Sequence, residues 1–174
     1  MLAESTIKAR MLTIREITRA SGTMAPVTTE GIACHEMPYI KTGNVRYCFY
    51  MTLRSDAAYA AGRLSVTHVD VLSFDVPSEG PAYLKEMGNV GGPQSRTLAK
   101  SPTGVTRFDP AAAIPIGANA DGTPINKTGA TVTVYALTGS NFVYATCANP
   151  NGSAKGLRAC ANRVVAAQLT KLNR

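Results

Sequence analysis

The chain has 174 residues, 45% of them apolar and only 17% charged. This length and composition indicate one globular domain with its own core and exclude a disordered chain. The formal net charge of +7 comes from scattered Lys and Arg residues that nowhere form a run of five. Aromatic residues do not alternate with them, so the pattern disfavours a nucleic-acid-binding protein and leaves it as an alternative.

The N-terminal segment 2–20 is the first predicted element, an amphipathic helix that ends at Ser21-Gly22. Its apolar residues recur at spacings of four, three and three: Ile7, Met11, Ile14 and Ile17. This stripe packs either on the sheet of its own domain or, as an assembly helix, on neighbouring subunits. The segment is too charged for a signal peptide, and the sequence has no apolar run long enough to span a membrane. The chain is therefore either cytosolic or has lost a leader.

The next part of the chain alternates loops with strands. Residues 23–41 contain prolines and a glycine and are interpreted as a loop, whereas the aromatic-rich residues 44–53 predict a strand. Residues 57–61 favour a short helical turn. Alternation over 63–76 predicts one long strand with an irregularity, or a hairpin, and the Pro/Gly cluster 77–81 ends it.

Residues 88–129 form a connector rich in glycine and proline, which is unusually long for a loop in a compact domain. Short strands over 103–108 and 113–116 are expected inside it. The clearest pattern follows in 130–147, where two β-branched runs flank a turn centred on Gly139-Ser140 and predict a hairpin.

The last element is a helix predicted over 157–172. The predicted fold is therefore α+β, with the N-terminal amphipathic helix packed on an antiparallel sheet and a short C-terminal helix. We expect a single domain over 1–174, with a β-rich body over 44–147 and a disulfide loop and helix over 148–174.

The four cysteines are spaced as two local pairs, Cys34 with Cys48 and Cys147 with Cys160. Neither spacing is the C-x2-C that holds zinc on a tight turn, even with His35 as a further ligand. We therefore expect two disulfides, each contributing about 3 kcal/mol on the chain-entropy model, and an oxidising compartment. Four buried free thiols are the alternative.

His68 and Asp70 come closest to a catalytic pair, because residues two apart on a strand share a face. No nucleophile elbow completes them, and ordinary contacts of a histidine are the simpler explanation. Residues 88–96 lack the lysine of a phosphate-binding loop, and residues 119–123 lack the carboxylates of a calcium loop. We therefore expect no catalytic centre, no cofactor and no metal site.

An N-terminal amphipathic helix, a long loop, antiparallel strands, and a late strand that runs into Cys147 follow one another in this chain. With Cys160 closing a polar loop, this order resembles the soluble part of a type IV pilin or pilin-like protein. The resemblance implies that Cys147 and Cys160 form the C-terminal bridge of that family and that 2–20 is the lower part of its spine helix. The chain departs from the family in lacking the apolar half of the spine and in extending fourteen residues beyond Cys160.

The predicted function is a non-catalytic, self-associating structural subunit of an extracellular filament or pilus-like assembly at the cell surface. The low share of charged residues leaves a neutral polar surface that suits packing against identical copies. Three alternatives remain: a virion capsid or tail subunit, a secreted hydrolase that uses His68 and Asp70, and a small basic nucleic-acid binder.

Overall fold

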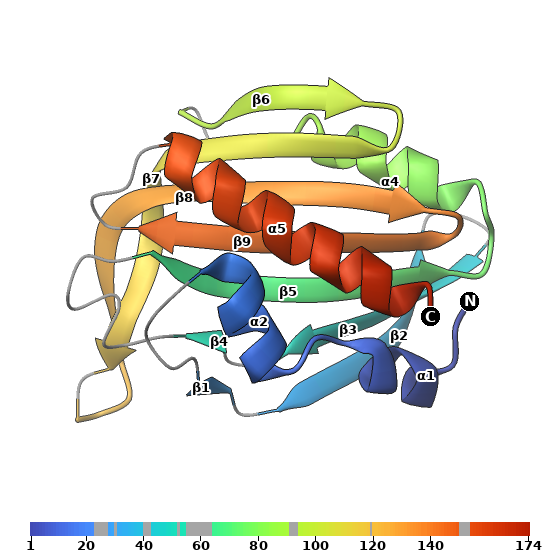
Figure 1. Cartoon of the computed structure of the whole chain (residues 1–174), viewed down its shortest axis with the longest axis horizontal. Coiled ribbons are helices and arrows are strands. Elements are labelled where there is room, and N and C mark those ends of the chain that lie inside the picture. The colour runs from blue at the N-terminus through green and yellow to red at the C-terminus, as the bar shows by residue number, and fades with distance from the viewer. Residues whose placement is uncertain are drawn as a thin grey trace.

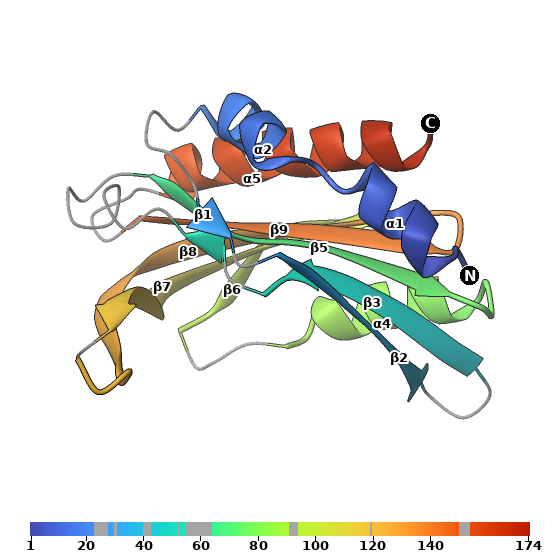
Figure 2. The ribbon, with the colours of Figure 1, turned by 90° about the horizontal axis from the view of Figure 1, so that it is seen from below.

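In the described part of the chain, the helices α1, α2 and α5 lie on one face of a curved β-sheet, and α4 lies on the other face (Figures 1 and 2). The computed structural model describes residues 1–22, 28–29, 31–39, 43–51, 53–54, 64–90, 94–118, 120–149 and 154–174. The helices are α1 (Glu4–Arg10), α2 (Ile14–Ser21), α4 (Glu79–Met87) and α5 (Ala154–Leu172). The strands are β1 (Thr28–Thr29), β2 (Ile32–Tyr39), β3 (Gly43–Tyr50), β4 (Leu53–Arg54), β5 (Ser65–Phe74), β6 (Arg96–Ser101), β7 (Gly104–Ala118), β8 (Pro124–Thr138) and β9 (Asn141–Asn149).

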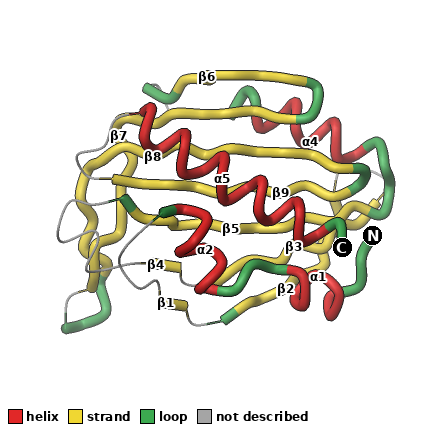
Figure 3. Tube along the Cα trace, viewed as in Figure 1, coloured by secondary structure: helices red, strands yellow, loops and turns green. Residues whose placement is uncertain are grey.

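The main sheet of the described chain has seven antiparallel strands in the order β2-β3-β5-β9-β8-β7-β6. The last strand in the sequence, β9, lies in the middle of the sheet, between β5 and β8. The short strands β1 and β4 form a separate pair. Figure 3 shows the long strands β7 and β8 extending together beyond the rest of the sheet.

Strand β5 illustrates how the sequence divides the two faces. Val69 and Val71 belong to the core under α1, α2 and α5, whereas Leu72 and Phe74 belong to the core under α4. The strand pairs with β9 through a register shift between Val66 and His68, which is the irregularity expected in 63–76. Side chains alternate between faces along a strand, so His68 and Asp70 share the face of Leu72.

The predicted architecture is wrong in its helices. The segment 2–20 forms two short helices, because Thr13 starts a new one with a capping box. The Thr13 hydroxyl accepts from the Glu16 N–H at 3.3 Å, while the Glu16 carboxylate accepts from the Thr13 N–H at 2.7 Å. A lone N-terminal helix packed on the sheet is therefore absent. The C-terminal helix is also not short, since α5 has 19 residues; α+β fits only in the broad sense.

Several segments interpreted as loops contain regular structure. Strand β2 lies in the predicted loop 23–41, and helix α4 follows the strand end expected at 77–81. The connector 88–129 contains β6, β7 and the start of β8, so the two short strands expected there are parts of the single strand β7. The hairpin expected over 130–147 is confirmed as β8 and β9. The helical turn expected at 57–61 lies outside the described residues.

The apolar stripe of the N-terminal segment is used inside the domain. Ile7, Met11 and Ile17 are buried in the core between the helices and the sheet, and Ile14 packs against that core. These side chains therefore contact their own domain, which was one of the two alternatives for the stripe.

Both disulfides predicted from the cysteine spacing are formed. Cys34 bonds Cys48 directly across the β2–β3 hairpin, and Cys147 at the end of β9 bonds Cys160 in α5. The second disulfide therefore joins the central strand to the helix that covers it. None of the described helices combines the length and apolarity needed to cross a bilayer.

Candidate functional site

The candidate site lies on the face of the sheet opposite α5. Helix α4 covers one end of this face, over a core that includes Leu72, Phe74 and Phe142. Beyond that core, three central strands bring Tyr47, Asp70 and Tyr144 together, and we call these residues the tyrosine–aspartate cluster. Figure 2 shows β2–β3 on one side and the ends of β7–β8 on the other bending toward this face.

The cluster is a hydrogen-bonded unit built from β3, β5 and β9. The Tyr47 hydroxyl donates to the Asp70 carboxylate at 2.6 Å and lies 2.9 Å from the Tyr144 hydroxyl. Asp70 is only 1% exposed, whereas both tyrosines are half-buried. The tyrosine rings pack on the α4 core at one end and present their hydroxyls to the carboxylate at the other. The carboxylate therefore fixes the orientation of two hydroxyls that lie nearer the surface.

The burial of the cluster changes its proton affinity. Burial raises the pKa of the Asp70 carboxyl above its usual range, although hydrogen bonds from Tyr144 and Tyr47 favour the ionised form. Burial also raises the pKa of Tyr47 and of Tyr144, and the neighbouring Asp70 charge adds to both shifts. Both hydroxyls are consequently protonated hydrogen-bond donors at neutral pH.

Asp70→Asn is expected to become more stabilising relative to the wild type as the pH rises. The folded state of the wild type binds a proton that the unfolded chain has already released above about pH 3.9. The stability that this proton provides is complete below that pH and is lost as the pH rises through the higher pKa of the folded state. Urea unfolding of both proteins at a series of pH values measures the difference.

Asp121→Asn is the matched control for this experiment. A hydrogen bond from the Thr123 N–H lowers the pKa of Asp121. The wild type is therefore expected to gain stability over Asp121→Asn as the pH rises through the same region. Equal slopes for the two variants would contradict the role of burial at Asp70.

His68 stands beside the cluster without joining it. It shares the face of Asp70, as the strand periodicity predicts, but the side chains that donate hydrogen bonds to the Asp70 carboxylate are tyrosines. The His68 Nδ1 lies 3.1 Å from the Thr67 hydroxyl, and its ring lies 6.5 Å from that of Tyr144. The imidazole is exposed. The hydrolase hypothesis needs an Asp70–His68 hydrogen bond, and the described contacts of these residues do not include one.

Aromatic rings extend the site across β3 and β2. Tyr47 stacks on Phe49 with ring centroids 4.7 Å apart, and His35 lies 5.6 Å from Phe49. On the other side, the hydroxyls of Thr133 and Thr146 are 2.8 Å apart. The face thus combines a flat aromatic surface with a row of hydroxyl groups, which is the combination found in sites for polar organic ligands.

Among the described residues, no group of three or more His, Cys, Asp and Glu side chains could hold a metal ion. The Cys34 sulfur is bonded to Cys48, so Cys34 is not a free thiolate that could bind a metal together with His35. Glu79 is buried, and its carboxylate has no hydrogen-bond partner among the described residues. The carboxylates of Glu79 and Asp75 both lie close to Gly43. Among the described residues no third metal-ligating side chain joins these two carboxylates.

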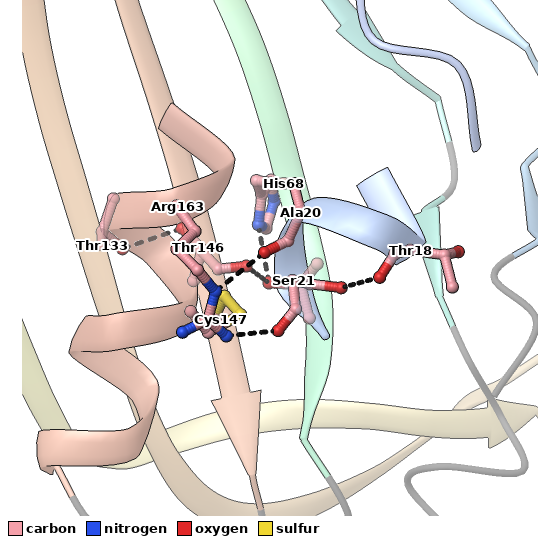
Figure 4. Close-up of a disulfide and its surroundings, with 10 residues drawn as sticks. Thr18, Ala20, Ser21, His68, Thr133, Thr146, Cys147 and Arg163 are labelled. Carbon is pink, nitrogen blue, oxygen red and sulfur yellow. Dashed lines mark hydrogen bonds between the residues drawn. A yellow bond between two sulfur atoms is a disulfide. The ribbon is translucent and has the colours of Figure 1, made fainter. Parts of the chain in front are cut away.

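The opposite face is held together around the second disulfide, as Figure 4 shows. Cys147 and Cys160 are fully buried, and Arg163 lies one turn further along α5. The Arg163 guanidinium donates to the Ala20 carbonyl at 2.9 Å and to the Ser21 carbonyl at 2.7 Å. These bonds satisfy carbonyl groups at the C-terminal end of α2, where a helix lacks internal partners. This region is therefore structural, and the tyrosine–aspartate cluster is separate from it.

The fold defines an antiparallel sheet with a long C-terminal helix on one face. It is similar to the extracellular domain of PknH from Mycobacterium tuberculosis, with a TM-score of 0.58 and 10% sequence identity. The match covers 99% of this chain and 97% of that domain. At this identity the likeness concerns the fold alone. No protein-family model matches the sequence, and no curated protein matches it either.

The strand pattern in the sequence predicts only part of this site. It placed His68 and Asp70 on a common face, but it did not single out Tyr47 or Tyr144. The signal was present in the aromatic residues of the predicted strands. Using it requires the strand order β3-β5-β9 and the pairing of Asp70 with Tyr144, which are long-range features.

Proposed function

We propose that the chain is an extracytoplasmic binding domain that takes a polyhydroxylated ligand, such as a saccharide, at the tyrosine–aspartate cluster. The observation that carries the proposal is the buried Asp70 carboxylate, which holds the hydroxyls of two half-buried tyrosines at the edge of the core under α4. Burying a carboxylate here costs free energy through desolvation. A role in orienting two hydroxyl groups for a ligand explains why the protein keeps this buried polar network.

The chemistry of the surrounding face supports the ligand class. Sugars offer hydroxyl groups that donate and accept, and they offer flat faces of C–H groups. Tyr144 and Tyr47 provide hydroxyls, and the Tyr47–Phe49 pair provides a flat ring surface. Asp70 acts here as a positioning residue, because its carboxylate is too buried to reach the ligand itself.

Two observations support the location outside the cytoplasm. The chain forms two disulfides, which persist in oxidising compartments and are rare in the cytosol. Its fold is similar to that of an extracellular domain. The sequence also led us to expect a location at the cell surface, and we include that location in the proposal.

The proposal is tested by titrating the protein with maltohexaose, cellohexaose and chitohexaose. The chain has seven tyrosines and no tryptophan, so its intrinsic fluorescence reports directly on tyrosines such as those of the cluster. Tyr144→Phe is expected to weaken binding at least about tenfold, the usual effect of deleting a hydrogen bond in a charged network. Tyr39→Phe is the matched control, because its hydroxyl bonds Glu86 at 2.8 Å, away from the cluster.

Two results would overturn the proposal. One is the absence of binding for all three saccharides at millimolar concentration. The other is an equal loss of affinity in Tyr39→Phe and Tyr144→Phe. The filament-subunit, pilin-like and virion hypotheses stay predictions, and sedimentation velocity of the purified chain tests the self-association that they require.

A further inference from the structure

The charge of this protein is concentrated on one face. Helices α1, α2 and α5 with the C-terminal Arg174 contain nine lysines and arginines, and their only acids are Glu4 and Glu16. The rest of the sequence holds nine residues of each sign. The entire formal charge of +7 therefore belongs to the three helices that lie together on one side of the sheet (Figure 2).

Most of these cations are available at the surface. Arg15, Arg19, Lys155, Arg158 and Arg174 are exposed, and they make no ion pair or hydrogen bond with the described residues. The positive face therefore contains several charges that the fold itself does not use. Charges that are spread over one side and left unpaired create a field that attracts an anionic partner.

A groove between α2 and α5 lies on this face and is lined by several cations. It has a volume of about 410 Å³ and an apolar floor that includes Leu12, Ala20 and Ala167. Its rim carries Arg19, Arg163, Lys171 and Arg174, with Glu16 as the only acid among the lining residues. Glu16 is already paired with Lys171 at 2.6 Å. Arg19 and Arg174 thus remain to bind an anion at the groove.

We propose that the helical face docks on a bilayer that contains anionic phospholipids, with lipid phosphates held at the groove by Arg19 and Arg174. The helices α1, α2 and α5 contain no aromatic residue, so they lack the stacking surface that single-stranded nucleic acids use. The two disulfides indicate an oxidising compartment, where a membrane surface is a more accessible polyanion than DNA or RNA.

This docking would orient the whole domain. The tyrosine–aspartate cluster lies on the opposite face of the sheet from α5, and it would point away from the membrane toward solutes. The docking proposal does not rest on the saccharide proposal, because it uses different residues and a different face.

The experiment is co-sedimentation of the intact chain with vesicles of phosphatidylcholine alone or with roughly 30% phosphatidylglycerol. We expect binding only to the anionic vesicles at about 25 mM salt, and loss of that binding at about 300 mM, where surface charges are screened. Replacing Arg19 and Arg174 together by glutamine is expected to weaken binding about 30-fold, since each basic residue near the surface contributes about 1 kcal/mol.

Lys85→Gln with Lys100→Gln is the matched control. It removes the same charge from two exposed residues on α4 and β6, outside the helical face, and is expected to bind vesicles as the wild type does. Circular dichroism melting checks that both double variants fold. The proposal is overturned by equal binding to neutral vesicles, by an equal loss in the control variant, or by tighter binding to duplex DNA at the same phosphate concentration.

Discussion

Replacing Cys147 and Cys160 by alanine is expected to lower the free energy of unfolding by about 3–5 kcal/mol. The bond closes a loop with a sequence separation of 13, for which the loss of unfolded-state entropy alone is worth about 3 kcal/mol. Both cysteines are fully buried, so their truncation also leaves space between β9 and α5. In urea, the unfolding midpoint should fall accordingly, and the melting temperature should drop by roughly 10 °C.

The first disulfide provides a matched comparison, because Cys34 and Cys48 have a nearly equal separation of 14. They lie opposite each other in a hairpin, and Cys34 is only half-buried. The double alanine variant of this pair should lose a similar entropic contribution and less packing. A larger loss there than for Cys147 and Cys160 would contradict the view that the second bond anchors α5 on the sheet.

Gln168→Leu is expected to destabilise the protein by about 2–5 kcal/mol, although leucine has a similar size and is more apolar. Gln168 in α5 is fully buried, and its carboxamide bonds the backbone between α1 and α2. The Leu12 N–H donates to its Oε1 at 2.9 Å, and its Nε2 donates to the Arg10 carbonyl at 2.8 Å. Leucine leaves both backbone groups without partners in a dry environment, and each costs about 1–3 kcal/mol.

Hydrogen exchange locates this effect. The Leu12 amide should lose its protection in Gln168→Leu while amides in the centre of β9 keep theirs. Thr170→Val is the control on the same helix, since the Thr170 hydroxyl only bonds the Ala166 carbonyl at 2.8 Å and is exposed. It should change the stability by less than about 0.5 kcal/mol. A Gln168→Leu variant as stable as Thr170→Val would show that the carboxamide is not needed.

The local patterns of the sequence predicted what depends on neighbouring residues. The β8–β9 hairpin and β5 follow from alternation and a turn, and the two disulfides follow from cysteines close in sequence. The break at Thr13 also had a local signal, the Thr13–Glu16 capping box, which the apolar periodicity across it concealed. Strand β2 was missed because it is an edge strand with exposed residues and Pro38, a composition typical of loops.

The candidate site needed information that no local pattern contains. Asp70 and His68 share a strand, so their common face could be predicted. Tyr47 and Tyr144 reach Asp70 from two different strands, and the two tyrosines are 97 residues apart in the sequence. Which strand neighbours β5 on each side is decided by the whole core, and the sequence alone gave no means of choosing that order.

The position of β9 has a consequence for the order in which the protein folds during its synthesis. The middle strand of the sheet, β9, and the helix that retains α1 and α2 both follow residue 140 in the sequence. The sheet therefore lacks its middle strand until β9 has been synthesised, and α1 and α2 meet the helix that holds them only about 150 residues later in the chain. Native packing of α1 and α2 is therefore expected only after α5 has been synthesised.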